Sequence, residues 1–159
     1  MNMDKIKLIV SEIDGIITEH LTTFDAIGNV PFKQYCMKDF EAINMFKKAG
    51  FKFAFVALDN NVNYYLAQKK NIPFFWDPNG NKKQALTKAL QRYEITPENL
   101  LYIGCSYSDL DLMKMAEYSF CPEDAVPEAK NVADAVLAAF SGTGVLCEAY
   151  TLVTKGFRE

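Results

Sequence analysis

The chain has 159 residues, of which half are apolar and 23% are charged, and this composition suits one globular domain spanning residues 1–159. Its net charge of -3 is spread without a long acidic or basic run, so neither nucleic acid nor an anionic membrane is expected as a partner. Four widely spaced cysteines and one histidine offer neither a zinc motif nor a disulfide framework, and no apolar run reaches the ~18 residues of a membrane span. These features predict a cytoplasmic protein.

Short β-rich runs alternate along the chain with segments of helical period, a pattern typical of a parallel sheet covered by helices. The expected strands span residues 7–10, 51–58, 73–75, 100–104 and 118–121. One interval departs from the alternation, because residues 21–25 and 30–35 are two strand-like runs around the turn signal at 26–29. We expect a β-hairpin there, standing beside the end of the first strand.

Two helices are expected between these strands. Residues 39–49 carry Phe40, Ile43, Met45 and Phe46 on the side that should face the core, and Gly50 is the expected terminator. Residues 82–93 show a similar apolar face, and residues 96–98 predict a short helical turn before the next strand.

The first expected strand ends in two acidic residues, Glu12 and Asp14, followed by Gly15. The spacing i, i+2 places both carboxylates on one side, at the strand end where open α/β sheets bind ligands. Such a pair suits phosphoryl transfer, since one carboxylate can attack phosphorus while the other handles the proton on the leaving oxygen.

Several motifs together resemble the haloacid dehalogenase superfamily, and most specifically its capless branch of 3-deoxy-D-manno-octulosonate 8-phosphate and nonulosonate 9-phosphate phosphatases. The carboxyl-terminal domain of animal acylneuraminate cytidylyltransferases is similar as well. The likeness runs over about residues 6–153, and its motifs stand at residues 12–15, 37–39, 81–82, 97–104, 108–109, 122–127 and 142–144. It implies a three-layer α/β, Rossmann-like fold with a central parallel sheet, a β-hairpin flap and no cap domain.

The resemblance also implies a magnesium-dependent phosphatase site at these positions. Glu12 stands where the family has its aspartate nucleophile, which also binds magnesium, and Asp14 keeps the general acid. Ala57 replaces a serine or threonine that contacts the phosphoryl group, and Lys82 keeps the amine that anchors phosphate.

The remaining positions of the family pattern are only partly kept. Cys105 replaces an aspartate that binds the metal, while Asp109 remains and joins Glu12 and Asp14 as a family metal position. Asp39 is implied on the substrate side, and Phe40 follows it where the family has glycine.

The substitutions predict a degenerate site. The extra methylene of Glu12 moves a carboxylate oxygen by roughly 1 Å, and a displacement of that order can cost ~10²-fold in rate. A thiol at Cys105 is a soft, normally protonated group where magnesium prefers oxygen, and Ala57 lacks the hydrogen-bond donor. We therefore expect little or no phosphatase activity and a role as a binding or assembly module.

Two other functions stay open at this stage. An active magnesium-dependent phosphatase of a phosphorylated sugar acid is compatible with Asp14, Lys82 and Asp109. A receiver-like signalling domain would use Glu12, Asp14 and Asp59, but the strand at 118–121 is followed by no lysine of the kind a receiver needs. Each acid also has a structural interpretation, as a solvated strand end, a turn former or a helix-capping group.

The resemblance finally implies a homotetramer, in which hairpins and tails of neighbouring subunits cover an otherwise open site. The residues support association independently, because the apolar side chains of the expected hairpin outnumber what one sheet face of a monomer can bury. These side chains are Leu21, Phe24, Ile27, Val30 and Phe32.

Overall fold

The computed structural model describes residues 1–58 and 61–155, and within them six strands form one parallel sheet in the order β3-β2-β1-β4-β5-β6. The strands are β1 (Leu8–Ser11), β2 (Lys52–Val56), β3 (Phe74–Phe75), β4 (Leu100–Ile103), β5 (Tyr118–Cys121) and β6 (Ala135–Val136). The five strands expected in the sheet are confirmed with shifted ends for four of them, and the short β6 adds a sixth.

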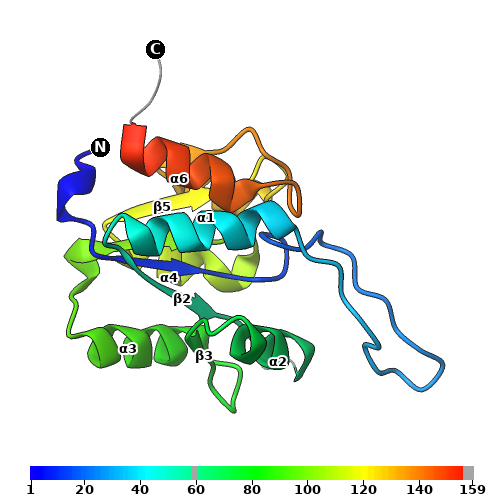
Figure 1. Cartoon of the computed structure of the whole chain (residues 1–159). Helices are drawn as coiled ribbons and strands as arrows, with labels where there is room; N and C mark the ends of the chain where they lie inside the picture. The colour runs from blue at the N-terminus through cyan, green and yellow to red at the C-terminus, as the bar shows by residue number, and fades with distance from the viewer. Residues whose placement is uncertain (59–60, 156–159) are drawn as a thin grey trace.

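Helices cover both faces of this sheet (Figure 1). They are α1 (Met37–Lys48), α2 (Asn61–Lys69), α3 (Lys82–Tyr93), α4 (Leu110–Met115), α5 (Pro127–Val132) and α6 (Val145–Lys155), with 3₁₀ turns at Met3–Lys5, Pro97–Asn99 and Tyr107–Asp109. The helices α1 and α6 pack against each other, whereas α4 contacts both α3 and α5. This arrangement confirms the three-layer, Rossmann-like fold without a cap domain.

The core lies on the central strands, because every residue of β1 and β4 is buried. Helix α1 adds the rings of Phe40 and Phe46 and the side chain of Ile43 to this core. Met45 does not join them, contrary to the expectation, and is 43% exposed. It stands two positions after Ile43, outside the i, i+3, i+4 stripe that faces the sheet.

The expected β-hairpin is not formed as two strands. Residues 19–36, which we call the projecting loop, leave the body as two extended arms without a ladder between them (Figure 1). A turn closes the tip, where the Asp25 amide donates to the Asn29 carbonyl over 2.9 Å, and at the base the Cys36 amide donates to Ile17 over 2.8 Å. From Leu21 to Val30 the large apolar residues recur at every third position rather than every second, so no single face of a ladder would collect them.

No helix in the described ranges 1–58 and 61–155 has the length and apolar character needed to cross a membrane.

Candidate functional site

The carboxyl ends of the central strands meet at one edge of the sheet, and the register explains which residues lie there. Ser11 pairs with Phe55 of β2 and with Ile103 of β4, so the residues that follow these strands lie close together. A cavity of about 180 Å³ opens at this edge. It is lined by Glu12, Asp14, Glu19, His20, Thr22, Leu58, Lys82, Cys105, Ser106 and Ser108.

Two glycines permit the close packing around this cavity. Gly15 has a φ of +80°, and a Cβ there would lie 2.6 Å from Cys105 Sγ, a contact that real side chains do not make. A Cβ at Gly104 would lie 2.7 Å from the Cβ of Asp109. Both positions therefore require glycine if the turn after β1 and the segment after β4 are to approach each other.

Lys82 lies between two carboxylates inside the site. Asn81 caps helix α3 by accepting from the Gln84 amide over 3.2 Å, and Lys82 follows as the first residue of the helix. Its ammonium forms an ion pair with Glu12 and donates to Asp109 Oδ1 over 2.7 Å. Glu12, Lys82 and Asp109 are all buried, so the interpretation of Glu12 and Lys82 as solvated surface groups is wrong.

Both oxygens of Asp109 are occupied by protein donors. Oδ1 accepts from the Tyr102 hydroxyl over 2.7 Å as well as from Lys82. Oδ2 accepts from the amides of Cys105 and Ser106, each over 3.0 Å, and from the Ser106 hydroxyl over 2.9 Å. Asp109 thus holds the turn after β4 in place, which agrees with its structural interpretation as a capping group.

Charges in this cluster are coupled. Burial raises the pKa of Glu12 to about 7, because the loss of hydration exceeds the attraction to Lys82. Burial alone would lower the pKa of Lys82, but the carboxylates of Glu12 and Asp109 more than offset it, so the pKa of Lys82 is raised. For Asp109 the attraction to Lys82 and the donated hydrogen bonds overcome burial and keep its pKa below the usual value.

Asp14 is held by residues from outside the family motif. Lys33 of the projecting loop donates to Oδ1 over 2.6 Å, and Asn63 of α2 donates to Oδ2 over 2.9 Å. The Thr18 hydroxyl is 3.4 Å from Oδ1. Sequence analysis did not identify Lys33 or Asn63. Lys33 is the one charged residue among residues 30–37, and this isolated charge could have indicated a buried partner. Nothing in the sequence indicated that Asn63 is buried.

Cys105 is a donor in this structure, and its thiol lies 3.3 Å from the Asp14 carbonyl oxygen. Burial, together with the nearby charges of Asp109 and Glu12, raises the pKa of Cys105 well above its usual value. The protonated thiol is therefore neither a nucleophile nor a ligand for a hard cation.

Two other predicted positions do not face the cavity. Asp39 is fully buried and caps helix α6, since its Oδ1 accepts from the amides of Leu146 over 2.9 Å and Cys147 over 3.2 Å. Within the described residues its Oδ2 has no hydrogen-bond partner, and burial raises its pKa to about 6. Ala57 is buried, has no polar side-chain atom and does not line the cavity. The next residue, Leu58, does line it.

The residues present do not fit a magnesium ion. Asp109 is saturated by protein donors, Glu12 is paired with Lys82, and Cys105 is a protonated thiol. No cluster of three histidine, cysteine, aspartate or glutamate side chains within residues 1–58 and 61–155 is arranged to hold a metal ion. The ammonium of Lys82 is instead the cation that the two buried carboxylates of Glu12 and Asp109 share.

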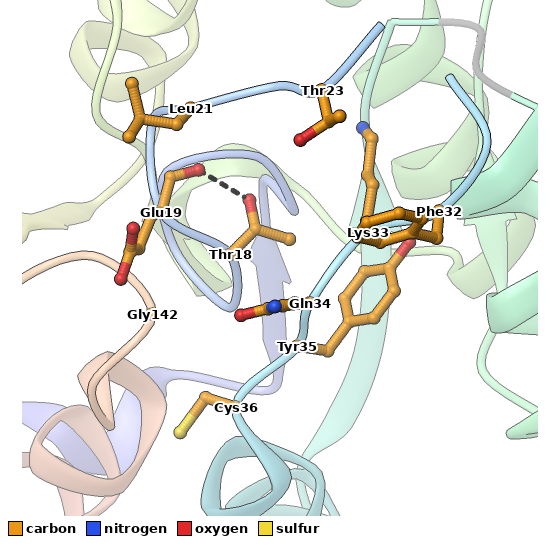
Figure 2. A pocket seen from close by; sticks show the side chains of 10 residues that line it. All are labelled: Thr18, Glu19, Leu21, Thr23, Phe32, Lys33, Gln34, Tyr35, Cys36 and Gly142. Atoms are coloured by element: carbon orange, nitrogen blue, oxygen red, sulfur yellow. Dashed lines mark hydrogen bonds between the residues drawn. The ribbon is translucent and has the colours of Figure 1, made fainter. Parts of the chain in front are cut away.

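A second cavity of about 330 Å³ lies where the projecting loop joins the body, and Figure 2 shows its lining. Gln34 and Cys36 point to one side of the extended chain and the Tyr35 ring to the other, while Lys33 extends toward Thr23 (Figure 2). Glu19 and Gly142 contribute the opposite wall. Glu19 lines both cavities, so the two lie next to each other at the base of the loop.

Comparison with known proteins places this geometry in a family context. Residues 40–147 match the model of haloacid dehalogenase-like hydrolases. The chain is 25% identical over 154 residues to the 3-deoxy-D-manno-octulosonate 8-phosphate phosphatase of Haemophilus influenzae, covering 96% of this chain and 85% of that protein. A phosphoglycolate phosphatase of Nitrosopumilus maritimus is 26% identical over 88 residues, which are 55% of this chain and 38% of that protein.

Solved structures agree with the fold over almost the whole chain. The cobalt-bound Haemophilus influenzae octulosonate phosphatase superposes with a TM-score of 0.89 at 25% identity, covering 97% of this chain and 90% of that one. The Moraxella catarrhalis phosphatase, in complex with magnesium, phosphate and the sugar acid, has a TM-score of 0.86 at 20% identity, with 97% and 88% covered.

Proposed function

The chain belongs to the haloacid dehalogenase-like hydrolase family, and we propose that it is a degenerate member of the sugar-acid phosphate phosphatase branch that acts as a binding or assembly module. The observation that carries this proposal is the closed ion cluster of Glu12, Lys82 and Asp109. Lys82 is the residue that should anchor phosphate, yet its ammonium is already bound by two buried carboxylates.

A phosphate entering this cavity meets unfavourable electrostatics. The side chains of Glu12, Asp14 and Glu19 line it, and the one lysine that lines it, Lys82, is already paired. Withdrawing Lys82 from either carboxylate would leave a buried charge without a partner, which typically costs about 3–5 kcal/mol. A dianionic phosphoryl group would therefore compete at a large disadvantage.

The three replaced groups support the same proposal, because each removes a different contribution to catalysis. Glu12 alters the position of the attacking oxygen, Ala57 removes a donor to the phosphoryl group, and Cys105 removes an oxygen ligand.

Assembly is the function that we propose to remain, and the resemblance suggests a homotetramer. Four apolar side chains of the projecting loop lie in solvent, with exposed fractions of 84% for Leu21, 63% for Phe24, 84% for Ile27 and 56% for Phe32. Burial of such side chains between copies would remove apolar surface from water and shield the arms of the loop. A cytoplasmic location and a single domain over residues 1–159 remain predictions from the sequence.

An active magnesium-dependent phosphatase of an octulosonate or nonulosonate phosphate is the competing proposal, supported by Asp14, Lys82 and Asp109 and by the activity named for the Haemophilus influenzae relative. The family match over residues 40–147 is to haloacid dehalogenase-like hydrolases and favours a hydrolase-like site over the receiver-like alternative. Its supposed phosphoacceptor, Asp59, lies outside the described residues.

A ligand-binding experiment distinguishes the degenerate site that we propose from an active phosphatase site. Isothermal titration of the purified chain with magnesium chloride, with inorganic phosphate, and with both together should show no saturable heat up to millimolar concentrations. The Haemophilus influenzae phosphatase is the positive control. Saturable binding of magnesium by the unmodified chain in the micromolar range would contradict the proposal.

A further inference from the structure

Asp14 makes its strongest contacts with the projecting loop and α2 rather than with the ion cluster at Lys82. The Lys33 ammonium lies 2.6 Å from Asp14 Oδ1, and only 6% of the Lys33 side chain is exposed. A lysine whose stem is buried and whose charge meets a carboxylate gains both apolar contact and a charge-assisted hydrogen bond. This pair joins residues 19 positions apart in the chain.

A second connection runs in parallel through Asn63. Its side-chain amide donates to Asp14 Oδ2 over 2.9 Å, and its carbonyl oxygen accepts from the Tyr35 hydroxyl over 3.0 Å. Asn63 is fully buried on α2, so the amide is oriented by the packing around it. Asp14, Asn63 and Tyr35 thus form a continuous hydrogen-bonded chain from the end of β1 to the loop.

The geometry of the loop explains why two of its residues reach the same place. In extended chain, side chains at i and i+2 point to the same side. Lys33 and Tyr35 have this spacing, and they reach Asp14 and Asn63, which are themselves hydrogen-bonded to each other. The next residue, Cys36, fixes the end of the arm through its 2.8 Å amide bond to the Ile17 carbonyl.

We infer that Asp14 serves this chain as the anchor of the projecting loop, with Lys33, Asn63 and Tyr35 forming a latch that fixes the direction in which the loop leaves the body. The residue at the general-acid position is thereby a positioning residue for an interaction surface. The inference deepens the proposed assembly function and rests on it, because the latch sets where the exposed apolar side chains of the tip are presented.

The latch gives the loop rigidity that its own backbone does not supply. No strand ladder forms within residues 19–36, so the return arm depends on side-chain contacts with the body for its position. The Lys33 contact is charge-assisted and therefore stronger than the neutral bond of the Tyr35 hydroxyl, although solvent reaches the 44% exposed side chain of Asp14 and weakens it. Loss of the Lys33 contact should consequently release the arm more than loss of the Tyr35 hydroxyl.

Hydrogen–deuterium exchange of the full chain tests the latch. Within the peptides covering residues 30–36 the hydrogen-bonded amide is that of Cys36, which donates to the Ile17 carbonyl, and this amide should exchange about tenfold faster in Asp14→Asn and Lys33→Met and about threefold faster in Tyr35→Phe. The double variant Asp14→Asn with Lys33→Met should exchange no faster than the faster single variant, since both changes break one contact. Lys48→Met, which alters an exposed lysine of α1, is the matched control and should leave these rates unchanged.

The same samples distinguish failure of the latch from failure of assembly. Peptides of β1 and β4 serve as the internal reference for global stability, and light scattering reports the mass of each variant. If the wild-type chain is a monomer, the exchange rates still decide whether the latch exists, while assembly alone is refuted. Unchanged exchange at residues 30–36 in both Asp14→Asn and Lys33→Met, or additive effects in the double variant, would overturn the latch.

Discussion

Lys82 Nζ lies 2.7 Å from Asp109 Oδ1, and this contact joins the start of α3 to the turn after β4 in the interior of the protein. The same ammonium pairs with Glu12, so one positive charge is shared by two carboxylates from two other segments, away from water. Removing one charged group from such a cluster lowers the free energy of unfolding by more than its ion pairs contribute, because the remaining charges stay buried without a partner. Lys82 therefore holds the site together in this chain.

Lys82→Met should destabilise the protein by about 3–5 kcal/mol, since Glu12 and Asp109 would be left as buried carboxylates without a counter-charge. Chemical denaturation at pH 8 measures the loss. The neighbouring exposed Lys83→Met is the matched control, with an expected change within about 0.5 kcal/mol. The loss of stability in Lys82→Met should be smaller at pH 5, where the carboxylates of Glu12 and Asp109 can take up protons. Equal losses of stability in Lys82→Met and Lys83→Met would show that the cluster contributes nothing to stability.

Asp39→Asn should make stability less dependent on pH. The pKa of Asp39 is raised by burial to about 6, so between pH 4 and 6 the folded protein holds a proton that the unfolded chain releases. The stabilising contribution is full below pH 4 and is lost as pH rises through 6. Asparagine keeps an oxygen for the amides of Leu146 and Cys147 without a charge to bury.

We expect the Asp39→Asn variant to be more stable than the wild-type chain at pH 8, by up to about 3 kcal/mol, and close to it at pH 4. Denaturation midpoints across this range provide the measurement, with Asp4→Asn at an exposed position as the control. If the stability of Asp39→Asn relative to the wild-type chain falls between pH 4 and pH 8, the raised pKa of Asp39 is refuted.

Restoring the family residues should require several changes at once. Glu12→Asp alone should give no detectable phosphatase activity, because Ala57 and Cys105 would still lack their chemical roles. Glu12→Asp, Ala57→Thr and Cys105→Asp together form the smallest set for which we expect activity. Release of inorganic phosphate from a panel of sugar-acid phosphates, with magnesium, measures the gain; full activity of Glu12→Asp alone would show that the other two positions are dispensable.

Cys105→Asp should also create a dependence of stability on divalent cations. It adds a carboxylate to a cavity that Glu12 and Asp14 already line, next to the buried Asp109, so the variant should unfold at a lower temperature without magnesium. Millimolar magnesium should raise its melting temperature by several degrees, while the wild-type chain should not respond. Equal responses of Cys105→Asp and the wild-type chain would contradict the loss of the metal site.

Charges placed on the tip of the projecting loop should dissociate the proposed homotetramer. Phe24→Asp and Ile27→Asp each replace an exposed apolar side chain of the loop, and both should give monomers by light scattering at micromolar concentration. Tyr65→Asp on α2 is the control, since Tyr65 is 69% exposed but lies on another element. A wild-type monomer under the same conditions would show that the tip does not mediate assembly.

The sequence allowed the sheet and its order of elements to be predicted because these depend on local patterns. Residues 118–121 and 82–93 were predicted with the ends that the structure gives to β5 and α3. Their boundaries are set by a short β-rich run and by an asparagine cap, signals that can be read within a few residues. Ranges for α2, α4, α5, α6 and β6 were not predicted.

The burial and pairing of the site residues could not be predicted in this way. The side chain of Glu12 follows a strand end, where exposure to water is common, and only the approach of Lys82 from another segment explains its burial. Asp39 was expected on the substrate side, yet the helix that it caps begins more than 100 positions later. Contacts over such separations depend on the completed fold and leave no periodic signal.

The prediction of a β-hairpin was wrong for a related reason. Its two arms contain residues that favour strands, such as Phe24 and Val30, but intrinsic preference for strands takes effect only where a face is buried. Within the described chain the arms have no sheet beside them, and the contacts of Lys33 and Tyr35 hold the return arm instead.

The central claim is that this chain retains the family fold without its phosphatase chemistry. The most direct measurement is phosphate release from 3-deoxy-D-manno-octulosonate 8-phosphate by the unmodified chain, at micromolar protein with magnesium, beside the Haemophilus influenzae enzyme. We predict no release above that of a Glu12→Gln, Asp14→Asn double variant prepared identically. Multiple turnovers that require magnesium, stop on chelation and disappear in the double variant would contradict the account.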